Sequence, residues 1–381
     1  MYQQLIDHLK NKRIVLLGMG REGHSTYNFI RRYLPEQKLI IADAKQVELD
    51  NDPNVEFVCG DGYLGAIDRA DIVIKTPGIP LLHFKRPQGV EITCQTDLFL
   101  RFSGFTCVGV TGTKGKTTTS TLIYSMLRAA GKEACLIGNM GYPVFDNIED
   151  CAGEIAVIEM SSHQLEFTTC SPHIAVLTNI YPEHLDHYDS FECYVGAKLN
   201  IVRNQSKGDT FIYNSDQGLD GFFDLSKYPG EAVGVSVHTP GAEKYRDINS
   251  HLLGEHNIQN CMFAAEAARR LGVSDEDIMK ALKDYEGIEH RMEYFATVKG
   301  IKFVNDCIAT IPHSVMCAVE ALGDVDTLIF GGMDRGLDYS AFEKALEKSS
   351  IRNLVCLPDT GHKIGCLLYT SPSPRDSTSS R

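Results

Sequence analysis

The most constraining feature of the sequence is a strand that runs directly into a Gly/Thr-rich loop and then a helix. Val108-Gly109-Val110 leads into Gly112-Thr113-Lys114-Gly115-Lys116-Thr117, and apolar residues at helical spacing continue to Ala130. Such glycines let backbone N–H groups surround phosphate oxygens, at the positive end of the helix dipole. Val110 stands where the strict Walker pattern has its first glycine. We predict a nucleotide phosphate site; a plain strand-to-helix turn is the alternative.

Side chains at the ends of this and the neighbouring strands predict a metal site. Lys116 can reach the outer phosphates, and the hydroxyl of Thr117 can join a Mg²⁺ shell. The apolar run 154–158 delivers Glu159 at its carboxyl end, where a carboxylate can hold Mg²⁺; an acid that simply begins a loop is the alternative. The next strand, 173–179, leads to His184 and His187, which could serve a second metal or acid–base chemistry, or be surface polarity.

Lys198 occupies an unusual place in its predicted helix. Ser190 is a typical N-cap, and an apolar face follows at Phe191, Val195, Leu199 and Val202. Lys198 shares that face, so it must be paired, shift its pKa or be modified. Extension of its amine to the surface is the alternative.

The first hundred residues predict a second nucleotide site. The strand 13–17 ends in Gly18-Met19-Gly20-Arg21-Glu22-Gly23, and the strand 38–42 ends at Asp43, which matches a dinucleotide-binding pattern. We interpret these residues as a phosphate cradle with a contact to a ribose or uridine; a turn that only needs small residues is equally compatible. The strand 71–75 ends in Thr76-Pro77-Gly78, at the same edge of the expected parallel sheet.

Length and composition limit the class of protein. The chain has 381 residues, enough for two or three domains, and a net charge of −13, which argues against general binding to nucleic acid or anionic membranes. It has no signal-peptide pattern and no apolar run of about 18 residues. Twelve cysteines are dispersed; we interpret Cys107, Cys135 and Cys261 as small buried hydrophobes in a cytoplasmic protein.

The C-terminal part predicts a further α/β domain. Asn257 and Asn260 project from one side of a helix expected over 251–270, where they could read a purine or cap the helix. Strand–helix alternation restarts near residue 291, with strands at 302–305, 327–330 and 351–356. The Ser/Pro-rich residues 367–381 are expected to be a disordered, non-native tail after an incomplete domain.

Taken together, the motifs resemble the ATP-dependent Mur ligases of peptidoglycan synthesis over residues 1 to about 366. The resemblance rests on spaced motifs: 111–117, 138–141, 159–166, 179–188, 197–198, 254–260, 290–291, 305–310 and 331–339. It implies an α/β chain of three domains: a Rossmann-like UDP-binding domain at 1–93, a central P-loop ATPase with a mainly parallel sheet at 94–290, and a partial Rossmann-like domain at 291–366.

The resemblance also implies a role for individual residues. The implied catalytic residues are Lys116, His184 and Lys198, the last as a carbamate. ATP would contact Gly112, Thr113, Lys114, Gly115, Lys116, Thr117, Thr118, Asn257, Asn260, Arg291 and Asp306. Two Mg²⁺ ions would be held by Thr117, Glu159, His184 and Lys198. The UDP substrate would contact Gly20, Arg21, Glu22, Asp43, Thr76, Gly78, Asn139 and Gln164, and D-glutamate would meet Thr310 and Arg335.

The implied reaction is the ADP-forming ligation of D-glutamate to UDP-N-acetylmuramoyl-L-alanine through an acyl phosphate, by a cytoplasmic monomer. Cys307-Ile308 stands where many members have Ser-Lys. Three alternatives stay open: a ligase for another amino acid or for folylpolyglutamate, an NAD-dependent oxidoreductase that uses 18–43, and an inactive nucleotide-binding fragment.

Overall fold

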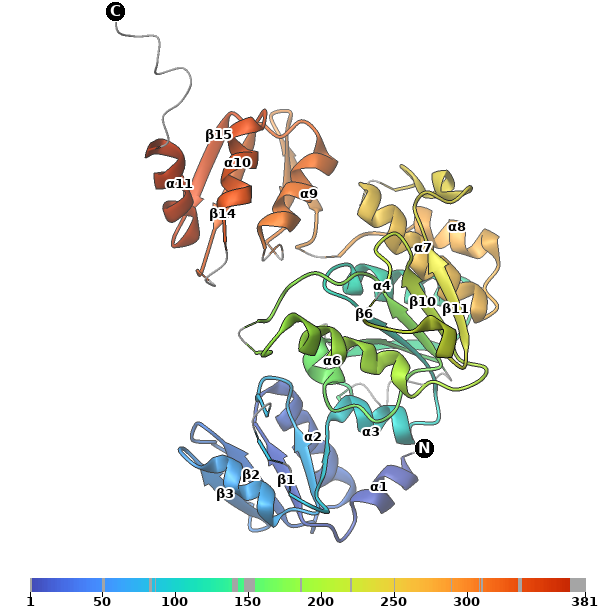
Figure 1. Ribbon diagram of the computed structural model, residues 1–381, viewed down its shortest axis with the longest axis vertical. Coiled ribbons are helices and arrows are strands. Elements are labelled where there is room, and N and C mark those ends of the chain that lie inside the picture. Colours follow the sequence, from blue (N-terminus) through green and yellow to red (C-terminus); the bar gives the residue numbers. More distant parts are fainter. Residues whose placement is uncertain are drawn as a thin grey trace, which may run out of the picture. The chain divides into compact units, whose positions relative to one another are not determined.

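Figure 1 shows the fold of the chain in a computed structural model. It describes residues 2–49, 52–81, 84–85, 87–138, 143–146, 155–185, 187–219, 221–249, 251–288, 290–307, 309, 311–334 and 338–370. They divide into two compact units, which we call the first unit (1–245 with 256–285) and the second unit (246–255 with 286–381).

The first unit begins with a five-stranded parallel sheet in the order β3-β2-β1-β4-β5. Its strands are β1 (Ile14–Leu17), β2 (Leu39–Asp43), β3 (Val55–Cys59), β4 (Ile72–Lys75) and β5 (Glu91–Thr93). Its helices are α1 (Gln3–Leu9), α2 (Arg21–Tyr33) and the 3₁₀ turn η1 (Tyr63–Arg69). All four residues of β1 are buried, as expected for a central strand covered on both faces.

A second, six-stranded parallel sheet follows in the order β11-β10-β9-β6-β8-β7. Its strands are β6 (Thr106–Thr111), β7 (Ala134–Gly138), β8 (Ile155–Glu159), β9 (Ile174–Leu177), β10 (Thr210–Asn214) and β11 (Glu231–Val235). Its helices are α4 (Lys116–Ala129), α5 (Ser162–Leu165), α6 (Phe191–Arg203), α7 (Glu255–Arg270) and α8 (Asp275–Lys283), with 3₁₀ turns η2 (Leu225–Lys227) and η3 (Ala242–Tyr245). Because β8 and β9 flank β6, their carboxyl ends meet beside the Gly/Thr-rich loop.

The two sheets of the first unit share one apolar core. The helix α3 (Gln95–Phe102) joins them. One cluster of buried residues extends from Leu16 of β1 in the first sheet to Ile158 of β8 in the second. Phe29 of α2 stacks on Phe145 with ring centroids 4.5 Å apart. The contact between the sheets is therefore a packed interior.

The second unit holds two small sheets within its described residues. The strands β12 (Glu293–Val298) and β13 (Ile301–Asn305) are antiparallel, whereas β14 (Thr327–Gly331) and β15 (Asn353–Leu357) are parallel. The helices are α9 (Pro312–Leu322), α10 (Ser340–Lys348) and α11 (Thr360–Thr370). Phe330, Phe342, Leu346 and Ile364 form its core.

Two expectations for this unit are wrong. The strand at 302–305 pairs with the unpredicted β12 and not with a parallel neighbour, because Lys299 and Gly300 take positive φ values of 51° and 81° and form a tight hairpin turn. The expected tail also begins too early: residues 367–370 belong to α11, since Leu368 packs against the small core.

The three cysteines interpreted as small buried hydrophobes lie inside the folded chain. Burial raises the pKa of the Cys107 and Cys261 thiols to about 12, so both are inert core residues. Cys135 is buried in the main apolar core, as expected, and it is disulfide-bonded. Within the described ranges, no helix has the length and apolar character needed to cross a membrane.

Candidate functional site

The Gly/Thr-rich loop lies at the carboxyl edge of the second sheet, between β6 and α4. Gly115, with φ +83°, is the N-cap of α4. Gly112 has φ +150°, and a Cβ there would lie 1.9 Å from the Thr178 hydroxyl oxygen. Only glycine therefore fits at Gly112. The loop leads directly into a helix of 14 residues, which is the arrangement that favours phosphate binding.

The end of the neighbouring strand β9 holds the loop in shape. The Thr113 N–H donates to the Asn179 carbonyl oxygen at 2.9 Å, and the Lys114 N–H donates to Asn179 Oδ1 at 2.8 Å. The Thr178 hydroxyl donates to the Lys114 carbonyl at 2.6 Å. Thr178 and Asn179 were not predicted as site residues. Their position at the end of a strand beside β6 is the sequence signal that could have identified them. The loop is thus preorganised.

Three lysines place their amines around the loop. Lys116 Nζ donates to the carbonyl oxygens of Gly112 and Thr113, each at 3.0 Å. Lys198 Nζ donates to the Gly112 carbonyl at 2.8 Å, and Lys114 Nζ lies 2.9 Å from Glu183 Oε1. Anionic phosphate oxygens would meet the side chains of Lys114 and Lys116 at the positive end of the α4 dipole.

Lys198 is buried, as its place on the apolar face of α6 predicts. It is 2% exposed, and the Ser190 hydroxyl accepts the Cys193 N–H at 3.2 Å as the predicted N-cap. Burial, and then the charge of Lys116, lowers the pKa of Lys198 well below its ordinary value. An amine in this setting favours its neutral form, which is nucleophilic.

Glu159 fits a magnesium site. It ends β8 beside the loop and is 3% exposed. Its Oε2 atom is buried and has no hydrogen-bond partner within the described part of the chain. A buried carboxylate oxygen without a partner destabilises the fold unless a cation or a proton binds to it. Mg²⁺ usually binds through one or two carboxylates together with phosphate oxygens. Thr117, at the start of α4, is half-buried.

The second expected metal position is less complete. His184 is 43% exposed, and its ring lies 6.3 Å from that of Tyr194, while Lys198 Nζ lies 4.7 Å from the same ring. The Lys198 amine donates to the Gly112 carbonyl and offers no oxygen ligand, which Mg²⁺ prefers. The described residues contain no group of three or more His, Cys, Asp or Glu side chains placed to hold a metal.

A cluster of histidines beside this position was not predicted as a unit. The ring of His163 lies 4.2 Å from that of His187 and 4.8 Å from that of His184. Burial, and then the charge of His187, lowers the pKa of His163 to about 3. His187 Nε2 lies 3.2 Å from Glu166 Oε2, and Lys75 Nζ lies 3.8 Å from that oxygen. This cluster links the ends of the two sheets.

The expected UDP site lies at the carboxyl edge of the first sheet. Asp43 Oδ2 accepts the Met19 N–H at 2.8 Å, so Asp43 holds the glycine-rich loop. A Cβ on Gly23 would lie 2.1 Å from the Gly18 carbonyl oxygen, which explains a glycine there. The Thr76 hydroxyl donates to the Leu17 carbonyl at 3.2 Å. The other expected residues on this edge, Gly20, Arg21 and Gly78, are exposed.

Glu22 and Gln164 meet across the boundary between the two sheets. Gln164 Nε2 donates to Glu22 Oε1 at 2.8 Å. Its Oε1 accepts the Ser161 N–H at 2.9 Å and so completes a capping box at the start of α5. Burial raises the pKa of Glu22 to about 7. Both residues were expected to contact the UDP substrate; in this structure they bind each other.

The two asparagines expected near adenine lie inside α7 and face the loop. Asn260 Nδ2 donates to Asn257 Oδ1 at 3.1 Å, and the Thr119 hydroxyl donates to Asn260 Oδ1 at 3.3 Å. Both asparagines are buried. The helix begins at Glu255 and not at His251, and neither asparagine occupies a cap.

The second unit brings Arg291 and Asp306 together. Asp306 Oδ1 accepts the Met292 N–H at 3.1 Å, and burial raises the pKa of Asp306 while the nearby Arg291 charge opposes that shift. Arg291 Nε is buried and has no hydrogen-bond partner within the described residues of this unit. Three expected site residues, Asn139, Thr310 and Arg335, lie outside the described residues.

Comparisons with known proteins agree with this geometry. Residues 110–227 match the Mur ligase middle domain family. The UDP-N-acetylmuramoylalanine–D-glutamate ligase of Pelodictyon phaeoclathratiforme is 32% identical over 93% of this chain and 86% of the relative. The enzyme of the same name from Acetivibrio thermocellus is 32% identical over 93% of this chain and 82% of the relative.

Solved structures show the same fold. The MurF ligase from Thermotoga maritima in complex with ADP superposes with a TM-score of 0.60 at 17% identity, over 96% of this chain and 87% of the other. A MurF structure from Acinetobacter baumannii gives a TM-score of 0.62 at 15% identity, over 95% and 87% of the two chains. The expected α/β architecture with mainly parallel sheets is confirmed.

Proposed function

Because this chain belongs to the Mur ligase family, which uses ATP to form amide bonds in peptidoglycan synthesis, we propose that it joins D-glutamate to UDP-N-acetylmuramoyl-L-alanine. The observation that carries the choice of amino acid is the identity of about a third of all residues, across most of both chains, with relatives named for that reaction. The products are the amide, ADP and phosphate.

The first step is phosphoryl transfer at the Gly/Thr-rich loop. The carboxylate of the L-alanyl group attacks the γ-phosphorus of ATP. The bond between that phosphorus and the bridging oxygen of the β-phosphate breaks. ADP departs, and the substrate carries an acyl phosphate. Lys116 would turn from the carbonyls of Gly112 and Thr113 to the phosphate oxygens. Loop N–H groups and the start of α4 would stabilise the charge on the transferring group. The asparagines of α7 would contact the adenine.

The residues around the loop would hold two Mg²⁺ ions. Thr117 and the unpartnered oxygen of Glu159 fit the first ion. His184 and a carbamylated Lys198 would hold the second. In that modification the neutral amine attacks carbon dioxide, a C–N bond forms and a proton leaves, which converts a buried cation into a carboxylate-like ligand. Bound Mg²⁺ would neutralise charge that gathers on the phosphoryl oxygens.

The second step forms the amide. The amine of D-glutamate attacks the acyl carbonyl, and phosphate leaves with the bonding electrons. The enzyme must hold the reactants together and keep water from the acyl phosphate. Arg291 and Asp306 of the second unit would contact ATP, and Thr310 and Arg335 would meet D-glutamate. The exposed edge of the first sheet, with Gly20, Arg21, Thr76 and Gly78, would bind the UDP group, and Asn139 the muramoyl group.

Amino-acid-dependent release of phosphate tests the proposal. With ATP, Mg²⁺ and UDP-N-acetylmuramoyl-L-alanine, D-glutamate should stimulate release, whereas L-alanine, a diamino acid and L-glutamate should not. Stimulation by one of those instead would replace the proposal with a related ligase, and a folate substrate in place of the UDP sugar tests the folylpolyglutamate alternative. Release that no amino acid stimulates would favour a nucleotide-binding protein without ligase activity.

The dinucleotide-binding pattern at 18–43 leaves one alternative function from another class of enzyme, an NAD-dependent oxidoreductase. If the first sheet bound NADH, the fluorescence of the cofactor would change on mixing. We expect no change, because the comparisons across this region are to UDP-sugar ligases. A cytoplasmic location and a monomeric state stay predictions from the sequence.

A further inference from the structure

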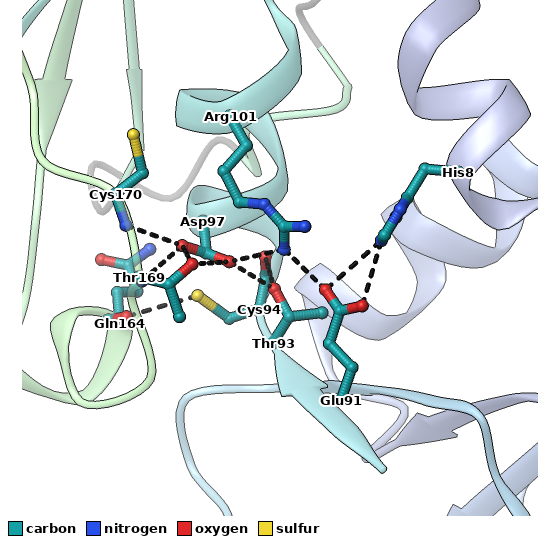
Figure 2. A network of polar contacts seen from close by, with 9 residues as sticks. All are labelled: His8, Glu91, Thr93, Cys94, Asp97, Arg101, Gln164, Thr169 and Cys170. Carbon is teal, nitrogen blue, oxygen red and sulfur yellow. Dashed lines mark hydrogen bonds and ion pairs between the residues drawn. The ribbon is translucent and has the colours of Figure 1, made fainter. Parts of the chain in front are cut away.

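The helix that joins the two sheets of the first unit, α3, makes buried polar contacts on both sides, and Figure 2 shows those of its residue Asp97. On one side, the fully buried Gln95 donates through Nε2 to the hydroxyls of Ser25 and Thr26 on α2, at 3.0 and 3.2 Å. On the other side, Asp97 binds the loop that follows α5. α3 therefore fixes α2 and α5 relative to each other.

Asp97 is a buried carboxylate with donors on both oxygens. It is 0% exposed. Its Oδ1 accepts the Thr169 N–H at 2.6 Å, the Cys170 N–H at 3.2 Å and the Thr169 hydroxyl at 3.0 Å. Its Oδ2 accepts the Thr93 hydroxyl at 2.8 Å and Arg101 Nη1 at 3.3 Å. Hydrogen bonds to an ionised acceptor in such a site are strong and directional.

The network continues from Asp97 to the first helix of the chain, as Figure 2 shows. Arg101 Nη1 also donates to Glu91 Oε1 at 2.6 Å, and Glu91 Oε2 lies 3.2 Å from His8 Nε2. Thr93 and Glu91 belong to β5 of the first sheet, while Thr169 and Cys170 lie in the loop that leads from α5 to β9 of the second sheet. Asp97 is thus the point at which groups of both sheets meet on one side chain.

The loop that Asp97 holds directly follows the residues that face the first sheet. It follows directly on α5, whose Gln164 bonds Glu22, and on Glu166, which lies 3.8 Å from Lys75. The thiol of Cys94, the residue that caps the start of α3, also donates to the Gln164 carbonyl at 3.3 Å. On its other side, the α5 segment touches the phosphate-loop strand, because the Thr111 hydroxyl donates to the Met160 carbonyl at 2.8 Å.

We propose that Asp97 is a positioning residue for the ligase reaction. By holding α5 against the first sheet, it sets the distance between the UDP site and the phosphate loop. This inference rests on the proposed function, in which one substrate spans both sites. A substrate fixed by its UDP group presents its carboxylate to ATP only when that distance is correct, and a small displacement costs much of the rate.

Asp97→Asn tests the role with little change of volume. The amide has one donor end, which must face either Arg101 or the N–H groups of Thr169 and Cys170, so one side of the network is lost. The matched control is Asp52→Asn. Asp52 also accepts from an arginine, a hydroxyl and a backbone N–H, namely Arg31, Tyr27 and Asn54, but all of them lie within the first sheet's own elements.

We expect Asp97→Asn to lower kcat with UDP-N-acetylmuramoyl-L-alanine by about ten- to a hundredfold. The KM for ATP and the affinity for UDP alone should be unchanged, because each of these ligands contacts only one of the two sheets of the first unit. The amides of Thr169 and Cys170 should exchange with deuterium faster. Asp52→Asn should lower the melting temperature without lowering kcat or changing that exchange.

Equal losses of kcat in the two variants would overturn the positioning role, and so would unchanged exchange at 169–170 in Asp97→Asn. Hydrogen exchange requires no turnover, so it separates failure of this role from failure of the proposed ligase activity, which the wild-type assay reports. If Asp97→Asn does not fold, Thr169→Val removes a single hydroxyl from Asp97. It should show the same loss of kcat at unchanged KM for ATP, and normal kcat in this variant would overturn the proposal.

Discussion

The amine of Lys198 lies 2.8 Å from the carbonyl oxygen of Gly112, in a place from which water is almost fully excluded. A shortened side chain there removes both the loop contact and the proposed carbamate. We predict that Lys198→Ala abolishes D-glutamate-dependent phosphate release and that added bicarbonate does not restore it. The exposed Lys207→Ala, on the loop after the same helix, serves as the matched control and should keep full activity.

Native mass spectrometry gives an independent measurement of the modification. Wild-type protein should carry the added mass of one carbon dioxide, which disappears on acidification and is absent from Lys198→Ala. Full activity of Lys198→Ala would remove Lys198 from the mechanism. An active wild-type protein without the added mass would leave Lys198 as an amine and remove the carbamate.

The unpartnered oxygen of Glu159 leads to a second prediction at the level of the residue. Glu159→Gln keeps the volume but removes the charge that would hold Mg²⁺. The extra thermal stabilisation by ATP with Mg²⁺, relative to ATP with a chelator, should be lost. At a hundredfold excess of ligand over its Kd, that loss is about 3 kcal/mol. Glu347→Gln, on an exposed position of α10, should retain it; retention by Glu159→Gln as well would exclude the metal role.

Single residues differ in how far the sequence determines their role. The burial of Lys198 could be predicted, because helical periodicity alone places it on the apolar face of α6. The role of Asp97 could not be, because its partners at 169–170 come together only through the packing of α3 on the second sheet. The histidine cluster around His163 likewise depends on the packing of α5 against the loop after β9.

At the level of the element, the shape of the phosphate loop depends on its contact with the end of β9. Gly112→Ala places a Cβ on the Thr178 hydroxyl and strains the backbone. Strain of this kind costs about 1–3 kcal/mol. We predict a larger loss in denaturant titration than for Gly208→Ala, where φ is +105° but no atom lies near the added Cβ.

Nucleotide binding distinguishes these two variants further. Calorimetric titration with ATP should show no binding to Gly112→Ala, because the loop can no longer keep its N–H groups in place, and unchanged binding to Gly208→Ala. Equal stability and equal ATP affinity of the two variants would contradict the contact with Thr178.

Elements with clear periodicity and clear ends were predicted well. The strands expected at 13–17, 38–42, 71–75, 154–158 and 173–179 match β1, β2, β4, β8 and β9 within one or two residues, whereas β3, β5, β7, β10 and β11 were not predicted. The strand β12 was missed, because its pairing depends on the backbone of Lys299 and Gly300, whose turn carries no strong sequence pattern. The last turn of α11 was missed for a related reason: Leu368 has its partners only in the folded unit.

At the scale of the whole molecule, the first two predicted domains share an interior that buries ionisable groups. Lys75 is 2% exposed and lies over the ring of Phe167 at 5.0 Å, close to Glu166. Glu22 faces Gln164 from α5 and the charge of Lys75 from β4. Groups with shifted pKa values at such a boundary make the stability of the first unit depend on pH.

Glu22 determines the sign of one such dependence. Its pKa is raised from 4.5 to about 7 by burial, against the effects of Gln164 and Lys75. Below pH 4.5 the carboxyl is protonated in both the folded and the unfolded chain, and its contribution to stability is fully present. Between pH 4.5 and 7 only the unfolded chain ionises, so that contribution is lost as the pH rises. His163, with a lowered pKa, acts in the opposite direction below pH 6.5 and partly hides the effect in the wild type.

The comparison of Glu22→Gln with the wild type isolates the contribution of Glu22 to the pH dependence, because His163 is present in both proteins. The free energy of unfolding of the variant, relative to that of the wild type, should rise by roughly 2–3 kcal/mol from pH 4.5 to pH 7.5. Denaturant titrations at intervals of half a pH unit measure it. The exposed Glu48→Gln, in the same part of the first unit, is the control and should run parallel to the wild type. A constant difference between Glu22→Gln and the wild type would mean that Glu22 ionises in the folded protein as it does in water, and that the boundary between the two sheets admits solvent.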